Sequence, residues 1–359
     1  MGLGAIVVVG AADPEILSSS VLQASGQESL LAEPPACIDA MGRPMMERTI
    51  ERFVRVGVEA ISVLVPAQIA YAVQAFPAAF KNVELQVVAD VSLAIAQKFK
   101  EYSHSGIEHS FVVPASLYTE TDLLDFFYFH REGKQAATRA FDAGGSLDLW
   151  VVDCAKAKDC ELDILLRRES SGSSYFIREY VNRVTDVRDL RRYVSDVLRG
   201  RCAIRPSGVE IKPGIWVEDG AELHRRARIV APAYIGRGTE IREDTLITRC
   251  SSVEEGCYID YGTVIEDSSI LANTHIGIWL DVCHSVAKGN KLFNLERNVI
   301  LEISDESIMR ATSLAGAEVR NISRASHQSQ PMFADLGQKE APTPERPERW
   351  TLGANPVEG

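Results

Sequence analysis

Four aspartates stand near the ends of predicted β-strands, where α/β proteins form their sites. They are Asp13, Asp90, Asp148 and Asp153. Carboxylate oxygens at such an edge can hold Mg²⁺, and a bound metal can serve nucleotidyl or phosphoryl transfer. Aspartates in these places also cap helices and close loops, which is the simpler interpretation of all four.

The second half of the chain has an apolar residue at every sixth position. These positions are Ile211, Val217, Leu223, Ile229, Ile235, Ile241, Ile247, Val253, Ile259, Ile265 and Leu271. A small side chain follows most of them four residues later. This spacing predicts a parallel β-helix, in which each six-residue unit forms one face of a triangular coil and stacking buries the aliphatic side chains. Amphipathic strands of the usual kind would instead alternate with a period of two.

Three histidines in this region are candidates for general-base catalysis of acyl transfer. They are His224, His275 and His284. His224 is second in its six-residue unit and is expected to face outward, His275 takes a corner, and His284 lies in the segment that closes the coil. None belongs to a long insertion of the kind that builds an acyl-CoA site, so a surface or edge role is the alternative.

The first 200 residues alternate between strand-like and helix-like segments. Buried strands are expected at Ala5–Val9, Ala60–Val65, Leu85–Val88, Phe111–Val113 and Leu147–Val152. Helical spacing occurs at Pro44–Val56, at about 67–80, at Leu123–Arg131 and at Asp186–Leu198. This alternation predicts a parallel sheet covered by helices. The end of the chain is rich in Pro, Gly and charge and is expected to be disordered.

Composition narrows the class of protein further. A chain of 359 residues that is 46% hydrophobic can hold two domains with cores of their own. Its net charge of -12 argues against a general nucleic-acid binder but leaves room for a local basic pocket. The seven cysteines include no CxxC pair, which disfavours a zinc or redox site of that kind. Without a basic leader or a long apolar run, the sequence predicts a cytoplasmic protein that does not contact a membrane.

Several segments resemble one known family. They are Met41–Val65 (MGRPMMERTIERFVRVGVEAISVLV), Phe111–Arg131 (FVVPASLYTETDLLDFFYFHR), Asn182–Leu198, Pro213–Val217 (PGIWV) and Ala231–Thr239 (APAYIGRGT). Together they resemble the sugar-nucleotide pyrophosphorylases, and most of all the mannose-1-phosphate guanylyltransferase branch. The resemblance implies a Rossmann-like, GT-A-like nucleotidyltransferase domain over residues 1–200, a left-handed parallel β-helix over 201–310, and a largely disordered tail over 311–359. The reaction it implies joins an NTP to a sugar 1-phosphate, with Mg²⁺, and releases pyrophosphate.

The phosphate-binding motifs of that family are changed in this chain. The family loop after the first strand reads Gly-Gly-x-Gly-Thr-Arg, whereas Val9–Asp13 reads VGAAD. The family's Pro-Lys pair falls near Pro34–Pro35, and no lysine occurs between residues 1 and 80. The nucleotide-binding candidates that remain here are Gly10, Ala11, Ala12 and Arg43. Arg43 could contact phosphate, or it could be a surface arginine before a helix.

The base-binding and metal-binding motifs are changed as well. The family's Leu-Gly-Thr-Ala-Gly stretch aligns with Val91–Ile95 (VSLAI), where Ser92 is the candidate for nucleotide contact. The resemblance places the two metal-binding aspartates at Ser116 and Arg183. A hydroxyl is a poor Mg²⁺ ligand compared with a carboxylate, and a guanidinium repels the metal.

These changes predict a nucleotidyltransferase-like protein with impaired catalysis, acting in sugar-nucleotide metabolism as a regulatory or assembly subunit. The expected partners are a nucleotide or sugar nucleotide, another copy of the chain, or a homologous pyrophosphorylase subunit. Two alternatives stay open. The first is an active nucleotidyltransferase that holds Mg²⁺ with non-standard ligands, and the second is a hexapeptide acyltransferase.

Overall fold

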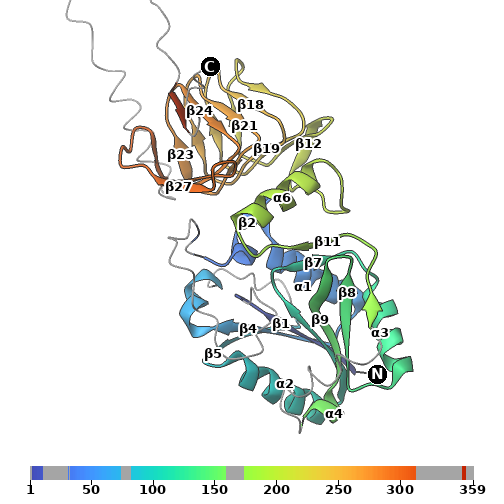
Figure 1. Ribbon diagram of the computed structural model, residues 1–359. Coiled ribbons are helices and arrows are strands. Elements are labelled where there is room, and N and C mark those ends of the chain that lie inside the picture. Colours follow the sequence, from blue (N-terminus) through green and yellow to red (C-terminus); the bar gives the residue numbers. More distant parts are fainter. Residues whose placement is uncertain are drawn as a thin grey trace, which may run out of the picture. The chain divides into compact units, whose positions relative to one another are not determined.

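The computed structural model describes residues 2–10, 31, 33–73, 82–158, 174–312 and 350–352. The chain divides into two compact units, Met1–Arg205 and Pro206–Gly359, and Figure 1 shows the elements of each. The tail that the sequence predicts to be disordered lies outside the described residues, apart from residues 311–312 and 350–352. None of the helices in the described ranges combines the length and apolar character that crossing a membrane requires.

A seven-stranded sheet forms the centre of the first unit. In order across the sheet, its strands are β10 (Tyr175–Phe176), β8 (Ala137–Asp142), β9 (Gly145–Asp153), β6 (Ile107–Pro114), β1 (Gly2–Val8), β4 (Ala60–Pro66) and β5 (Val83–Val88). Strands β6, β1, β4 and β5 are parallel, while β9 runs antiparallel to both β6 and β8. The mixed α/β class with a largely parallel sheet therefore agrees with the sequence prediction.

Helices cover both faces of this sheet. They are α1 (Met45–Val56), α2 (Val91–Ser105), α3 (Leu123–Gly133) and α4 (Cys154–Ala157), and α6 (Val187–Leu198) ends the unit. Side chains alternate along a strand, so Val7 packs with the core beneath α1 and α3 while Ile6 packs with the core beneath α2 and α4. Phe53 of α1 and Phe99 of α2 are buried on these two opposite faces.

Shorter elements complete the first unit. They are η1 (Pro35–Cys37), β2 (Asp39–Ala40), β3 (Arg43–Pro44), η2 (Ala67–Val73), β7 (Leu117–Thr119) and β11 (Val181–Arg183). Helix α1 begins after Pro44 and ends at Gly57, which adopts a left-handed conformation with φ 85° and donates its N–H to Phe53 and Val54. This terminal turn leads the chain back into β4, which places the next strand beside β1.

The second unit contains three sheets that the chain visits in rotation. The first holds β12 (Val209–Lys212), β13 (Ile215–Val217), β16 (Ala233–Ile235), β19 (Ser251–Val253), β22 (Ser269–Ile270), β25 (Ser285–Lys288), β26 (Lys291–Asn294) and β27 (Val299–Glu302). The second holds β14 (Glu222–Leu223), β17 (Glu240–Ile241), β20 (Tyr258–Ile259), β23 (Thr274–Ile276) and β28 (Met309–Ala311). The third holds β15 (Arg228–Ile229), β18 (Leu246–Thr248), β21 (Val264–Glu266), β24 (Leu280–Cys283) and β29 (Trp350–Leu352). The many parallel strands are compatible with the predicted β-helix.

The predicted apolar positions account for much of the core of this unit. Nine of the eleven, from Val217 to Ile265, belong to or pack against one apolar cluster. Ile211 is an exception, since it lies on the antiparallel strand β12 and its side chain is 51% exposed. Leu271 is the other, because Val253 pairs with Ile270, so Ile270 continues the buried row. The six-residue spacing thus ends at Ile265, one unit earlier than predicted.

Small polar side chains fill the corners of this core and bond to the backbone. The Thr239 hydroxyl donates to the Glu254 carbonyl at 2.7 Å, and the Cys257 thiol donates to the Leu271 carbonyl at 3.2 Å. Burial raises the pKa of Cys257 to about 12, which keeps it a thiol. Buried polar groups with partners of this kind cost little to fold. Cys257 is therefore a buried packing residue of this core.

Candidate functional site

The carboxyl ends of the parallel strands meet at one edge of the α/β sheet. Gly10 follows β1, Ser116 follows β6, and Asp142 ends β8, which runs parallel to β6 because both are antiparallel to β9. Ligands of open α/β sheets bind outside this edge. It is therefore the candidate site of the first unit.

The two positions that the resemblance gives to metal ligands are neighbours at this edge. Strand β7 pairs antiparallel with β11, which sets Arg183 opposite Leu117. The backbone N–H of Val184 donates to the Ser116 carbonyl at 2.8 Å. Two residues that are far apart in the sequence thus lie together at this edge.

A cation and a carboxylate already pair at this place. Nη2 of Arg183 lies 3.1 Å from Oδ1 of Asp142, and the same oxygen accepts the Gly144 N–H at 2.8 Å. The Arg183 side chain is 41% exposed and that of Asp142 is 21% exposed. An ion pair this open to solvent contributes about 0–1 kcal/mol to stability, so its main effect is to hold the Arg183 guanidinium beside Asp142 at the edge of the sheet.

These residues do not fit Mg²⁺. The metal prefers carboxylate and water oxygens in an octahedral arrangement, whereas the two positions offer a hydroxyl and a guanidinium. The carboxylate that contacts Arg183, that of Asp142, already accepts a hydrogen bond from it. Within the described ranges, no three His, Cys, Asp or Glu side chains form a group that could hold a metal ion. No step of metal-assisted transfer can therefore be assigned to Ser116 and Arg183.

The aspartates considered as alternative metal ligands have other structural roles. Asp90 caps α2 and accepts the Leu93 N–H at 2.9 Å. Asp148 lies 2.7 Å from Nη2 of Arg139. Asp153 caps α4 and lies at the opposite edge of the sheet, because β9 runs antiparallel to β6 and sets Asp153 opposite His109, near the start of β6. Asp153 thus cannot join a site at the carboxyl edge, and its role as a helix cap agrees with the simpler interpretation of these aspartates.

Asp13, Ala11 and Ala12 lie outside the described residues. Gly10 is exposed in a left-handed conformation with φ 79°, and a Cβ there would meet Cδ1 of Ile69. Only glycine fits this position without strain. The turn after β1 therefore requires a glycine at this position.

Arg43 and Ser92 lie in different surroundings from each other. The Arg43 guanidinium is 3.2 Å from Glu47 and 3.3 Å from Glu51, both on α1. Its donors thus serve carboxylates of the neighbouring helix, which favours the surface interpretation. Ser92 is half-buried in the first turn of α2, two residues after the cap Asp90.

A small cavity lies between α1, α3 and the sheet. It is lined by Thr49, Arg52, Phe53, Val113, Leu117, Thr119, Leu123 and Leu149. The Thr49 hydroxyl donates to the Leu117 carbonyl at 3.1 Å, and Arg52 donates to the Thr121 carbonyl. These bonds hold the segment that follows Ser116. The residues around the cavity therefore position the edge and do not themselves form a binding site there. Sequence reasoning missed both the cavity and Asp142, although the Asp-Ala-Gly-Gly run from Asp142 is a turn signal.

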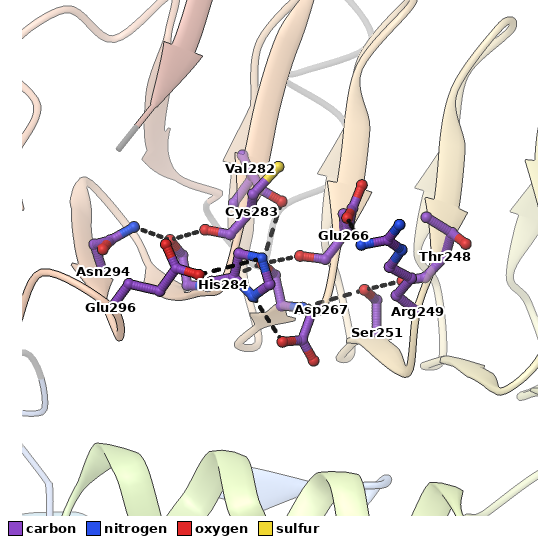
Figure 2. Close-up of polar contacts among 12 residues, drawn as sticks. Thr248, Arg249, Ser251, Glu266, Asp267, Val282, Cys283, His284, Asn294 and Glu296 are labelled. Carbon is purple, nitrogen blue, oxygen red and sulfur yellow. Dashed lines mark hydrogen bonds and ion pairs between the residues drawn. The ribbon is translucent and has the colours of Figure 1, made fainter. Parts of the chain in front are cut away.

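The three histidines of the second unit differ in their carboxylate partners. Nε2 of His224 is 4.0 Å from Glu243, and Nε2 of the buried His275 is 4.0 Å from Asp260. Nδ1 of His284 is 2.8 Å from Oδ2 of Asp267, as Figure 2 shows. Of these three candidates, His284 is therefore the one that a carboxylate orients through a hydrogen bond.

Comparison with known proteins gave matches to solved structures alone. No protein-family model matches the chain, and neither does any curated protein. Among solved structures, the chain is similar to a protein assigned as a glucose-1-phosphate thymidylyltransferase from Bacillus anthracis, solved in complex with a sucrose. The TM-score is 0.41 and the identity 9%, over 53% of this chain and 93% of that one. A likeness this distant assigns no activity to the chain.

Proposed function

We propose that this protein acts in sugar-nucleotide metabolism as a non-catalytic, nucleotidyltransferase-like subunit. One observation carries the proposal. Where the resemblance places two Mg²⁺-binding aspartates, Ser116 and Arg183 lie together and Arg183 is paired with Asp142. In this proposal the first unit is a GT-A-like nucleotidyltransferase domain and the second a left-handed parallel β-helix.

The chemistry of the edge supports binding better than catalysis. Nucleotidyl transfer requires the charge of the attacked phosphate to be neutralised and its leaving group to be stabilised, which Mg²⁺ and basic side chains do together. Arg183 supplies one positive charge in place of a metal, and Asp142 already offsets part of it. Such a group can attract the phosphates of a nucleotide or sugar nucleotide without Mg²⁺, but it does not bridge two phosphate oxygens and a nucleophile.

A subunit of this kind needs a partner. The proposed partner is another copy of the chain or an active, homologous pyrophosphorylase subunit in the cytoplasm. The three-sheet unit would make the assembly contact. Binding or release of a nucleotide or sugar nucleotide at the edge of the α/β sheet would regulate the partner. Regularly repeated parallel strands give such a unit a rigid surface on which to assemble.

An assay of pyrophosphate release tests the proposal. Purified protein is incubated with each common NTP, a set of sugar 1-phosphates and Mg²⁺, beside an active pyrophosphorylase as positive control. The expected result is no pyrophosphate above the blank. Turnover would refute the proposal, and loss of that turnover in Asp142→Asn would identify the active enzyme with non-standard ligands.

The Asp267–His284 pair supports a second candidate function, a hexapeptide acyltransferase. A histidine oriented by a carboxylate at 2.8 Å can take a proton from an amine or hydroxyl acceptor as it attacks an acyl thioester. However, Oε1 of Glu296 stands 3.6 Å from the remaining ring nitrogen. Thiol release from an acyl-CoA that disappears in His284→Gln would establish this function, whereas no release with amino- and hydroxy-sugar acceptors would exclude it.

A further inference from the structure

Strand β5 forms one edge of the α/β sheet. It is paired with β4, and within the described ranges no strand pairs with its other side (Figure 1). Its six pairs with β4, from Val83 to Val88, follow one another in regular register. The side chains of Leu85 and Val87 are 39% and 52% exposed. An edge strand of this length with exposed apolar side chains is a template for pairing with another chain.

Strand β5 lacks the features that usually protect a sheet edge, which are lysine, proline, a bulge or a very short strand. It reads VELQVV and has no irregular register. The opposite edge of the same sheet, β10, is only two residues long. Strand β12, at an edge in the second unit, contains Lys212 and has an irregular register between Glu210 and Lys212. Of these three edges, β5 is therefore the least protected.

The backbone direction of β5 shows which groups are at the free edge. The Ile61 N–H donates to the Asn82 carbonyl at 2.9 Å, so the backbone groups of Asn82 face β4. Because these groups alternate in direction along a strand, those of Val83, Leu85 and Val87 point to the free edge. Each of the three residues offers one N–H donor and one C=O acceptor there.

We propose that β5 pairs antiparallel with β5 of a second copy of this chain, which continues the sheet across a two-fold axis. Leu85 then lies at the axis, opposite the partner's Leu85, and Val83 lies opposite the partner's Val87. Hydrogen-bonded pairs of this kind exchange two N–H···O bonds each, so every free group of the three residues is used. A register centred on Gln86 would instead set Val83 opposite Ala89, which lies outside the strand.

The apolar side chains of β5 suit this pairing. Leu85 and Val87 lie on the same face of the sheet as Val63 and Val65, their partners in β4. Those two valines belong to the core beneath α1 and α3. Pairing of two copies brings their exposed Leu85 and Val87 side chains together on this face, and a two-fold contact needs a patch that complements itself in this way.

The single charge of β5 does not oppose the pairing. In the proposed register, Glu84 lies opposite the partner's Gln86, on the face away from Leu85. The Glu84 carboxylate is already paired with Nζ of Lys98 at 3.1 Å. The two strands therefore set no like charges directly opposite each other, an arrangement that would be destabilising.

Sedimentation equilibrium of the full-length protein tests this contact, which is separate from the assembly contact proposed for the three-sheet unit. The expected mass is an even multiple of the 39.5 kDa chain. Leu85→Lys sets two ammonium groups opposite each other at the axis and should raise the dissociation constant at least about tenfold. Leu124→Lys is the matched control, because that leucine is 38% exposed on α3, and it should leave the mass unchanged.

A second variant removes one backbone donor of the contact. Val87→Pro deletes an N–H that points to the free edge, so the pairing with β4 is kept while the contact weakens. Amide exchange followed by NMR gives an independent readout. In the unsubstituted protein the Leu85 and Val87 amides should exchange slowly, and in Leu85→Lys the Val87 amide should exchange quickly. The Glu84 and Gln86 amides face β4 and should exchange slowly in both.

Two outcomes would overturn the proposal. One is an unsubstituted protein that is monomeric at every concentration measured. The other is a folded Leu85→Lys variant whose mass and whose Val87 amide exchange are unchanged, which would place any contact between copies elsewhere. The assay of pyrophosphate release does not depend on β5, so this proposal and the proposed function can fail separately.

Discussion

The interior of the second unit and the carboxyl edge of the α/β sheet are built under different constraints. In the interior, Ile259 and Ile265 are fully buried, and they pair with Ile241 and Ile247 in the register that the spacing predicts. At the edge, Ser116 and Arg183 are partly exposed, and their backbone pairing does not depend on which side chains they carry. Burial in the core restricts which side chains fit in the first region. In the second region the fold accepts many side chains, and only a chemical function would restrict them.

Under the proposed function, this difference explains how a chain can keep the fold of an enzyme family without its reactive groups. The apolar core beneath α1, with Ile50 and Phe53, is intact because folding requires it. The proposal places a hydroxyl and a guanidinium where the family has two carboxylates. Such a change at an exposed edge costs folding little, and the Arg183 guanidinium is paired with Asp142. Resemblance in the core therefore supports the fold far better than it supports the reaction.

The largest predicted effect contrasts a buried and an exposed isoleucine of the same unit. Ile265→Ala removes a fully buried side chain and should lower the free energy of unfolding by about 2–5 kcal/mol. Ile278→Ala, at a side chain that is 57% exposed, should change it by less than about 0.5 kcal/mol. Denaturant unfolding followed by circular dichroism measures both. Equal costs would mean that the inward row does not form the core.

A second prediction concerns pH and the α/β unit. Burial, with neighbouring His109 as the next cause, lowers the pKa of His130 to about 4. Below about pH 6.5, the usual histidine pKa, the unfolded chain binds a proton that the folded chain does not, so stability falls by about 3 kcal/mol as the pH drops to 4. His130→Gln should flatten this dependence in unfolding measurements from pH 7 to pH 4. The exposed His104→Gln is the control and should leave the slope unchanged.

A third prediction restores carboxylates at the edge. The double variant Ser116→Asp, Arg183→Asp places two acidic side chains where β7 and β11 meet and frees Asp142 from its cation. Mg²⁺ should bind at least about tenfold more tightly than to the unsubstituted protein, a gain of about 1.4 kcal/mol. Titration calorimetry measures this directly. An unchanged Mg²⁺ affinity would show that the two positions do not face one site.

The smallest predicted effect separates a helix cap from a metal ligand. Asp90→Ala removes the bond from Asp90 to the Leu93 N–H and should cost about 1 kcal/mol of stability. It should not change the binding of any nucleotide, because the side chain serves α2. If the free energy of nucleotide binding fell by more than the free energy of unfolding, Asp90 would be a metal ligand after all.

The local spacing of apolar residues predicted the buried row of the second unit, but it could not predict where that row changes register or in which direction each strand runs. The six-residue spacing identifies the buried row up to Ile265, but the next step to Ile270 has five residues, which no fixed period foresees. The reversed direction of β9 was also hidden, because alternation is the same in parallel and antiparallel strands. Only the alternative in which Asp153 binds a metal at the carboxyl edge is excluded by this direction.

Sequence reasoning could point to only some residues of the candidate edge, for a similar reason. The resemblance named Ser116 and Arg183, and the pairing of β7 with β11 brings them together. Asp142 was missed because its contact with Arg183 depends on β8, which shows no regular apolar alternation. Contacts between distant segments follow from the tertiary fold and leave no local signal in the sequence.

Calorimetric titration with GTP, UTP and GDP-mannose, each with and without Mg²⁺, tests the central claim most directly. A site in which Arg183 stands in place of the metal predicts that Mg²⁺ leaves every binding curve unchanged, and that any binding of GDP-mannose weakens in Arg183→Ala. Binding of GTP or UTP that requires Mg²⁺ would contradict the account and show that the site still holds the metal.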